Sequence, residues 1–384
     1  MDKTSMMHYL PELERDAIER RLAELKAMHP DLGVCVLLPE AEKDKVGVLQ
    51  SAFAGCKVPL MGAIFPALVK EGRFVTSGAW LLCFVEMPYF VLQEDLPPLA
   101  AEAELVAEKI AGDIRAQIDS TSDFTLFMLF DAMVPNIGTL LDNLYLHLAN
   151  RVHYAGANAG SESFQPMPCL FDGERTVQNG VLLMLLRHHK GAILEHGYQT
   201  NPHTSYATST SGNCISQIDW RPAFDVYREL VHEHYGEEVT AKNFYQYGVH
   251  FPFGIVRANH HVLVRIPVML ADDGSLFCVG EVPANSVLTL LKAPTVRTVE
   301  TLHNVAEGLK ALNGDIEGAE LLLFYCAGRR LHLGIPMATT ELEAFAGLTQ
   351  ASQVAGALSL GEIGGSTVNG YPLFHNATLV ASRW

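Results

Sequence analysis

The feature that most constrains the fold of this 384-residue chain is a unit that occurs three times. Each copy holds a short apolar run, a stretch of helical length, a second apolar run with a Gly-Ala pair, and a third apolar run. The Gly-Ala pairs lie at residues 62–63, 156–157 and 356–357. Short apolar runs are typical of buried strands, and self-similarity along a chain indicates a repeated architecture. The sequence therefore predicts three related strand–helix–strand–strand units.

The predicted elements follow the same order in each copy. In the first copy they are residues 34–38, 40–54, 58–63 and 77–85. In the second copy they are residues 124–130, 137–149, 152–157 and 179–186. In the third copy they are residues 321–326, 340–350, 353–357 and 374–380. Because the strands alternate with helices but return at once as hairpins, we expect an α/β fold with mixed sheets.

Three sequence domains are predicted around these copies. Residues 1–29 form an N-terminal segment with an amphipathic helix at 11–28. Residues 30–220 form a first domain and residues 221–384 a second one. The stretch between the second and third copies is rich in strands, with a hairpin near 206–219, helices at 222–235 and 296–312, and a hairpin of 262–269 with 275–280.

Composition and charge exclude several classes of protein. Hydrophobic residues make up 49% of the chain and charged residues 18%, which is typical of a globular protein and not of a disordered one. The formal net charge of −16 would repel nucleic-acid phosphates and anionic membrane surfaces. We therefore expect no nucleic-acid partner and no membrane insertion.

The cysteines and the N-terminus favour a cytoplasmic location. The seven cysteines include no CxxC pair, as expected for reduced thiols in a cytosolic protein. The first residues contain no apolar core of a signal peptide, and the longest apolar runs have the length of strands.

The familiar catalytic motifs do not occur in the sequence. It contains no GxxxxGK[ST], no HExxH, no GxSxG, and no GxGxxG after a predicted strand. We therefore expect a protein that is not an enzyme. The alternative is an enzyme with a Cys/His site, for which Cys326 and His375 are the candidate pair.

Four histidines have surroundings that suggest cofactor binding. They are His196, His203, His250 and His375. A histidine among aromatic residues can be the single axial ligand of haem iron, which makes each of them a candidate metal ligand. A core histidine that is hydrogen-bonded to the backbone has the same sequence signature.

Three further residues are predicted to bind a small ligand. Arg329 and Glu362 follow strands of the third copy, and Asn376 lies near its last predicted strand. In α/β sheets ligands bind outside the carboxyl ends of strands. An arginine and a glutamate there could hold the carboxylate and ammonium of a small zwitterion, or they could form a structural ion pair.

Several of these segments together resemble one family. The segments are GAIFP at 62–66, YAGANAG at 154–160, GNCISQIDWRPAF at 212–224, FPFG at 251–254, FYCAGR at 324–329, GEI at 361–363 and HNAT at 375–378. In this order and spacing they resemble the FIST family, with a FIST N domain over 30–220 and a FIST C domain over 221–384.

The resemblance implies a sensory role in signal transduction. The family is regarded as sensing small ligands such as amino acids. A chain with the two FIST domains and no output domain resembles a stand-alone subgroup, which includes haem-binding nitric-oxide sensors that regulate a partner histidine kinase. Haem b is therefore the expected cofactor if one binds, with one of the four histidines as its ligand. The alternative is a metabolite sensor without haem.

Overall fold

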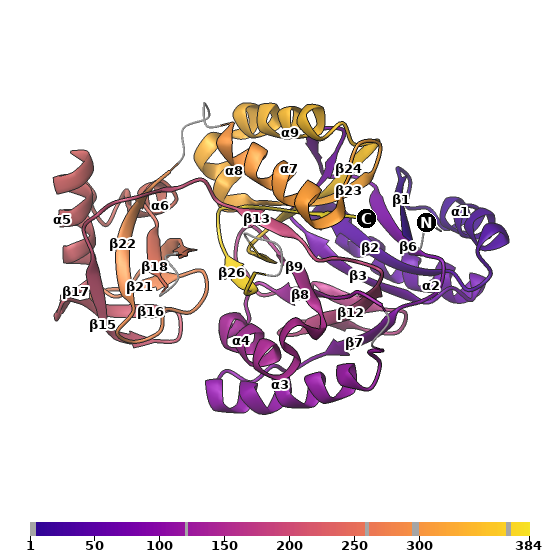
Figure 1. Ribbon diagram of the computed structural model, residues 1–384, viewed down its shortest axis with the longest axis horizontal. Helices are drawn as coiled ribbons and strands as arrows, with labels where there is room; N and C mark the ends of the chain where they lie inside the picture. Colours follow the sequence, from indigo (N-terminus) through magenta and orange to yellow (C-terminus); the bar gives the residue numbers. More distant parts are fainter. Residues whose placement is uncertain (1–4, 120–121, 258–260, 294–298, 366–369) are drawn as a thin grey trace.

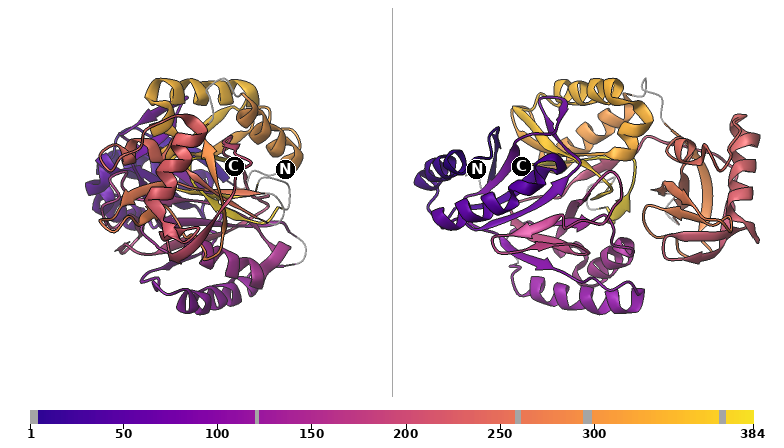
Figure 2. Two further views of the ribbon diagram at one scale, coloured as in Figure 1. Left: turned by 90° about the vertical axis from the view of Figure 1, so that its left-hand side faces the viewer. Right: turned by 180° about the vertical axis from the view of Figure 1, so that it is seen from behind.

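The computed structural model describes residues 5–119, 122–257, 261–293, 299–365 and 370–384. Its described residues form two bodies, a larger one and a smaller one that lies at one end of it (Figures 1 and 2). The chain enters the smaller body after β13 (Ile193–Glu195) and is back in the larger body at α7 (Glu300–Asn313). The smaller body is therefore an insertion into the third repeat.

The larger body contains the three predicted repeats, and each has the order β-α-β-α-β-β. The first repeat consists of β1 (Ser5–Leu10), α1 (Arg15–Met28), β2 (Gly33–Pro39), α2 (Val46–Cys56), β3 (Leu60–Phe65) and β6 (Ala79–Phe84). The second consists of β7 (Tyr89–Gln93), α3 (Ala100–Arg115), β8 (Phe124–Asp131), α4 (Ile137–Leu148), β9 (His153–Ala159) and β12 (Val181–Arg187). The third consists of β13, α7, β23 (Glu320–Cys326), α9 (Ile335–Thr349), β24 (Gln353–Ser359) and β27 (Leu379–Arg383). The prediction of an α/β fold built from repeats is confirmed.

The strands of the three repeats pair in the same way. The sheet orders are β1-β6-β2-β3, β7-β12-β8-β9 and β13-β27-β23-β24. In each, the second strand of the repeat pairs in parallel with the third and antiparallel with the last. The sheets are therefore mixed, as predicted.

The glycines of the three Gly-Ala pairs occupy equivalent positions. Their partners on the neighbouring parallel strands are Val36 for Gly62, Met128 for Gly156 and Leu323 for Gly356. A Cβ atom added to these glycines would lie 2.6, 2.1 and 1.7 Å, respectively, from the carbonyl oxygen of that partner. Only glycine fits at such a close approach of two backbones, which explains why the pair marks every repeat.

Each repeat also sends a hairpin into the sheet of another repeat. The hairpins are β4 (Ala67–Lys70) with β5 (Arg73–Val75), β10 (Leu170–Asp172) with β11 (Thr176–Val177), and β25 (Glu362–Gly364) with β26 (Leu373–His375). The first extends the third sheet beside β24, the second extends the first sheet beside β3, and the third extends the second sheet beside β9. Each sheet thus gives one hairpin and receives one, which closes a ring of three sheets.

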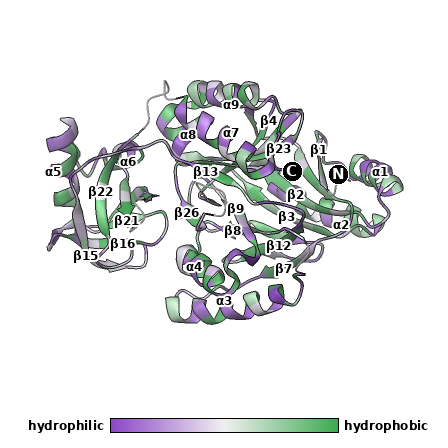
Figure 3. Cartoon of the chain, viewed as in Figure 1, coloured by the Kyte–Doolittle hydropathy of each residue, from purple (hydrophilic) through white to green (hydrophobic). Residues whose placement is uncertain are grey.

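The inner faces of the three sheets share one core. The ring centroid of Phe324 lies 5.5 Å from that of Phe65 and 6.1 Å from that of Phe127, so all three repeats meet there. Helix pairs α1–α2, α3–α4 and α7–α9 cover the outside (Figure 1). Figure 3 shows hydrophobic residues along the strands, while the outer helices mix hydrophilic and hydrophobic residues.

The smaller body is built on a nine-stranded antiparallel sheet with two helices. Its strands are β14 (Gln199–Thr200), β15 (Ser205–Ser211), β16 (Cys214–Ile218), β17 (Arg221–Pro222), β18 (Phe253–Val256), β19 (Val262–Arg265), β20 (Pro267–Leu270), β21 (Leu276–Cys278) and β22 (Val287–Lys292). The helices are α5 (Ala223–Tyr235) and α6 (Phe244–Gly248). Within the described ranges, no helix of the chain combines the length and the apolar character needed to span a membrane.

Some predicted elements differ from the structure. The predicted strand 374–380 is two segments, because Ala377 adopts a left-handed conformation with φ of 55° that ends β26 before β27 begins. The predicted strand 262–269 is also two segments, β19 and β20, which pair with different neighbours. Helix 40–54 begins as a 3-10 turn over Glu40–Lys45. The start of the predicted helix 296–312 and residues 1–4 of the predicted N-terminal segment lie outside the described residues.

The remaining differences concern elements and boundaries. Helix α3, the edge strands and the exchanged hairpins were not predicted. The predicted sequence boundary near residue 220 falls inside the smaller body, between β16 and β17. The division into 1–29, 30–220 and 221–384 stays a prediction about sequence domains, and the two bodies follow a different division.

Candidate functional site

A cavity of about 170 Å³ lies between the two bodies. Its walls are mainly apolar and come from both bodies. They include Val249, Ile266, Val268 and Val279 of the smaller body and Leu331 and Leu360 of the larger one. Polar groups line it at Cys326, Asn376 and Glu162. A concave apolar site with a few polar groups is the usual form of a small-molecule site.

The exchanged hairpin of the third repeat places two of the polar groups side by side. Cys326 is the last residue of β23, and Asn376 directly follows β26. The backbone N–H of Ala377 donates a hydrogen bond to Cys326 Sγ at 2.9 Å. Asn376 is buried, and its Nδ2 donates to the carbonyl oxygen of His375 at 3.2 Å. Among the described residues, Asn376 Oδ1 has no hydrogen-bond partner.

A buried carboxyl group supports this end of the cavity. Glu362 accepts hydrogen bonds from Ser359 Oγ and Thr378 Oγ1, each at 2.5 Å. Burial raises the pKa of Glu362 to about 7, although these hydroxyl groups oppose the shift. Burial, with the added effect of the Glu362 charge, also raises the pKa of the Cys326 thiol. Cys326 is therefore a protonated thiol at neutral pH, and Glu362 titrates near neutrality.

The raised pKa of Glu362 predicts a pH-dependent stability. In the unfolded chain this group releases its proton near pH 4.5, whereas in the folded protein it keeps the proton up to about pH 7. The folded state binds more protons between these values, so stability falls as pH rises, by roughly 3 kcal/mol. We expect Glu362→Gln to remove this loss. In urea unfolding, the variant should gain roughly 2–3 kcal/mol on the wild type between pH 5 and pH 8.5. The exposed substitution Glu12→Gln is the control, and an equal difference at both pH values would contradict the prediction.

Two of the predicted histidines lie together, and one of them, His375, is the partner of Glu362 in the pairing of β26 with β25. The rings of His196 and His375 stack with centroids 6.0 Å apart. Burial lowers the pKa of His375 well below its usual value, and burial with the Arg329 charge lowers the pKa of His196 to about 4. Both are therefore neutral. His196 Nδ1 accepts the N–H of Tyr198 at 2.9 Å, whereas neither ring nitrogen of His375 has a partner among the described residues.

This arrangement bears on the Cys/His alternative. Cys326 Sγ accepts a backbone N–H, and within the described part of the chain no hydrogen bond joins it to the His375 ring. A nucleophilic cysteine needs a base or a positive charge that lowers the pKa of its thiol. The pair predicted for an enzyme is therefore not formed in this geometry.

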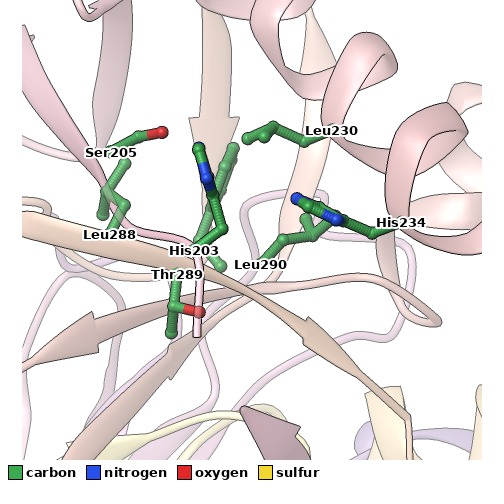
Figure 4. A pocket seen from close by; sticks show the side chains of 8 residues that line it. His203, Ser205, Leu230, His234, Leu288, Thr289 and Leu290 are labelled. Carbon is green, nitrogen blue, oxygen red and sulfur yellow. The ribbon is translucent and has the colours of Figure 1, made fainter. Parts of the chain in front are cut away.

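The other two histidines lie elsewhere. His250 contacts His332 of α8 (Ala327–Leu333) through their Nδ1 atoms, at the junction of the two bodies. His203 is exposed on the smaller body, where its ring lies 5.4 Å from that of His234. Figure 4 shows the two rings at a pocket that has no room for a water molecule. The four predicted histidines thus belong to three separate places, and none lines the cavity between the bodies.

The cavity also limits the size of a cofactor. Its volume of about 170 Å³ is below the roughly 300–1,000 Å³ typical of pockets for drug-sized ligands, and haem is larger than most such ligands. Among the described residues, no group of three or more His, Cys, Asp or Glu side chains is arranged to hold a metal ion. In this geometry the cavity fits a small molecule and does not fit haem.

Arg329 takes part in a buried ion pair instead of facing the cavity. Its Nε and Nη2 donate to the two carboxylate oxygens of Glu341 on α9, at 2.7 and 2.6 Å. Its Nη1 donates to the carbonyl oxygen of His196 at 2.7 Å, and Tyr325 Oη donates to Glu341 at 2.7 Å. In this geometry Arg329 pairs with Glu341 and not with Glu362, so the structure brings together neither the predicted zwitterion site nor an ion pair between Arg329 and Glu362. Sequence reasoning missed Glu341 because its approach to Arg329 depends on how α8 and α9 pack.

Polar contacts join the two bodies around the cavity. Glu281 of the smaller body accepts hydrogen bonds from the backbone N–H and Oγ1 of Thr139 in the first turn of α4, at 2.8 and 2.7 Å. Arg265 Nη1 donates to the carbonyl oxygen of Phe374 at 2.9 Å. Such interfaces are typical of domains that move relative to one another. The junction of the two bodies thus combines these polar contacts with the apolar walls of the cavity.

Comparison with known proteins identifies the chain. The FIST N domain matches residues 31–221, and the FIST C domain matches residues 223–365. The chain belongs to the FIST family. FIST domains are generally sensor domains of signal transduction and are not known as enzymes. The boundary between the two FIST matches lies in the smaller body, so β14–β16 belong to the FIST N match, and the elements from α5 to β25 belong to the FIST C match.

One curated relative is similar to this FIST protein. It is an uncharacterized protein of the archaeon Methanocaldococcus jannaschii, 24% identical over 275 residues. The alignment covers 66% of this chain and 51% of the relative, so the chain spans about half the length of the curated relative it matches.

Proposed function

We propose that this FIST protein is a cytoplasmic sensor that binds a small molecule in the cavity between its two bodies. The observation that carries the proposal is the cavity of about 170 Å³ with walls from both bodies. A ligand there contacts Val268 of the inserted body and Asn376 of the exchanged hairpin at the same time. The affinity of the ligand therefore depends on the position of the two bodies relative to each other.

Such a ligand can act as a signal. It favours the arrangement of the bodies that it binds more tightly, and by linkage any partner that prefers this arrangement binds more tightly as well. Tyr245 and Leu331 line the cavity and are also partly exposed, so they connect the ligand with the surface. The partner we propose is a histidine kinase or a similar effector. With its net charge of −16, the sensor should meet a basic patch on this partner, so the association should weaken as salt concentration rises.

A pair of neighbouring substitutions tests the site. Val268 lines the cavity, whereas Met269 on the same strand is exposed. Thermal unfolding of the full chain with a panel of amino acids and other small metabolites should reveal ligands that raise the midpoint, because they bind only the folded state. Val268→Phe should remove this rise by filling the cavity, and Met269→Phe should keep it.

The partner is tested with the same variants. In pull-downs and titrations with histidine kinases of the same cell, the wild type and Met269→Phe should bind the kinase with different affinities in the presence and absence of the ligand. Val268→Phe should bind the kinase with the same affinity in both conditions. Equal affinities with and without ligand would overturn the sensor proposal. A midpoint rise that persists in Val268→Phe would place the ligand elsewhere.

A haem-based nitric-oxide sensor is the second candidate. The observation in its favour is His375, a buried neutral imidazole whose ring nitrogens have no partner among the described residues. Such a nitrogen can bind iron, but the cavity between the bodies is too small for haem and His375 does not line it, so haem at His375 would require a different packing of the residues around it. After reconstitution with haem, the protein should show a Soret band that shifts on addition of nitric oxide and is lost in His375→Ala. A protein that stays colourless would favour the metabolite sensor.

A further inference from the structure

We propose that the ligand of the cavity between the bodies is a small neutral molecule with an O–H or N–H group at one end. Its hydrocarbon part should be about the size of one six-membered ring. This inference rests on the proposed function in one respect, namely that the cavity is the ligand site. The size, the hydrogen-bonding pattern and the charge of the walls each point to this class.

The volume of the cavity sets the size of the ligand. An engineered apolar cavity of about 150 Å³ is known to hold benzene. The cavity of this protein, at about 170 Å³, has room for a similar ring and one additional heavy atom. Its apolar walls, which include Ile266, Val268 and Leu360, would contact the hydrocarbon part.

The polar end of the cavity needs a donor from the ligand. Asn376 is 1% exposed, and its Nδ2 already donates to the carbonyl oxygen of His375. Its Oδ1 is an acceptor without a partner among the described residues. Cys326 Sγ beside it already accepts the N–H of Ala377. A buried acceptor without a donor is unfavourable, so a ligand O–H or N–H group directed at Asn376 Oδ1 would gain affinity.

The charges around the cavity favour a neutral ligand. The described residues of its lining include no lysine or arginine. A carboxylate inside it would therefore be buried without a counter-ion among these residues, which is costly. Glu162 is the one carboxylate among the described lining residues; it forms an ion pair with Arg330 at 2.6 Å and is partly exposed. A cationic group would compete with Arg330 for it, whereas a neutral donor needs only Asn376.

Four compounds separate these features in two pairs of equal size. Phenol has the ring and the donor, and toluene has the ring without the donor. Benzamide has the ring with a neutral N–H donor, and benzoate is its negatively charged counterpart with the same number of heavy atoms. In isothermal titration of the full chain, we expect phenol to bind about tenfold more tightly than toluene, the factor typical of one buried acceptor left unpaired. Benzoate should bind at least about a hundredfold more weakly than benzamide.

Variants of the chain test which groups are responsible. Asn376→Leu should remove the preference for phenol while toluene still binds, which also shows that the variant is folded. Asn376→Asp keeps an acceptor oxygen and should keep the preference. Val268→Phe should abolish the binding of both compounds, and Met269→Phe should change neither.

The outcomes separate this inference from the proposed function. Equal affinities of phenol and toluene, both lost in Val268→Phe, would overturn the donor class and leave the cavity as the ligand site. Tight binding of benzoate, or no binding of phenol, would overturn the proposed ligand class. Thermal unfolding with the metabolite panel tests separately whether the cavity is the ligand site. Binding of phenol that is unchanged in Val268→Phe would overturn the cavity as the site.

Discussion

Replacing Gly356 by alanine is expected to prevent stable folding of the larger body. A Cβ atom at this position would lie 1.7 Å from the carbonyl oxygen of Leu323 and 2.7 Å from its carbonyl carbon. Both atoms are backbone of β23, which is paired on both sides, so neither strand can move away. The φ angle of 155° adds a further penalty for any residue with a side chain. We expect a loss of more than about 4 kcal/mol, which is a large part of the stability of an ordinary domain.

A second glycine of the same repeat provides the control. Gly347 lies on α9, and a Cβ atom added to it meets nothing within 4 Å. Gly347→Ala should therefore stabilise the protein by about 0.5–1 kcal/mol, because alanine is the better helix former. Urea unfolding followed by circular dichroism measures both effects. If Gly356→Ala unfolds within about 1 kcal/mol of the wild type, the close approach of β23 and β24 is not as described.

The second large effect is expected when Arg329 is replaced by methionine. The side chains of Arg329 and Glu341 are 2% and 10% exposed, and they form a bidentate pair. Burial opposes the ionisation of Glu341, but Arg329 holds the pKa of this carboxyl below its usual value. Without the arginine, the buried carboxylate of Glu341 loses its counter-ion and two of its donors, although Tyr325 Oη still donates to it, and the carbonyl oxygen of His196 loses the N–H of Arg329. We expect a cost of about 3–5 kcal/mol.

An exposed ion pair and a double variant separate the causes. Arg15 and Glu19 form a pair on the surface of α1, so Arg15→Met should lower the unfolding free energy far less than Arg329→Met does. In the double variant Arg329→Met with Glu341→Leu the unpaired charge is gone, so the cost should be clearly smaller than the sum of the single variants. The comparison uses the unfolding free energies of Arg15→Met, Arg329→Met, Glu341→Leu and the double variant. Equal costs for Arg329→Met and Arg15→Met would contradict the buried ion pair.

The repeated architecture could be predicted because its signal is local. Each repeat needs a glycine where the third strand passes close to the backbone of the second, and Gly62, Gly156 and Gly356 mark these places in the sequence. Apolar runs on both sides of them have the length of buried strands, so most central strands and helices were placed within a few residues. Edge strands such as β1 and β7 were missed because edge strands carry a weaker apolar pattern.

The candidate site was predicted only in part. Cys326 and Asn376 were singled out in the sequence, and the structure brings both to the cavity because β23 and the exchanged hairpin end there, whereas His375 does not line the cavity. Other predicted residues serve different purposes, as Arg329 does in its ion pair with Glu341. His203 and His250 lie in the stretch that is inserted into the third repeat between β13 and α7, and nothing local in their segments shows that this stretch forms a separate body.

The amino-acid sequence by itself thus determined the three repeats, their mixed sheets and the glycines at their centres. Close backbone approach requires a glycine and burial requires apolar runs, so both recur in the sequence of each repeat. Only the tertiary structure decided that the hairpins are exchanged among the repeats and that residues 199–292 form an inserted body. It alone decided as well that a cavity lies between this body and the hairpin with Asn376. These features depend on contacts between segments far apart in the chain. Strand pairing between repeats uses backbone groups that every residue carries, so it leaves no pattern in the side chains.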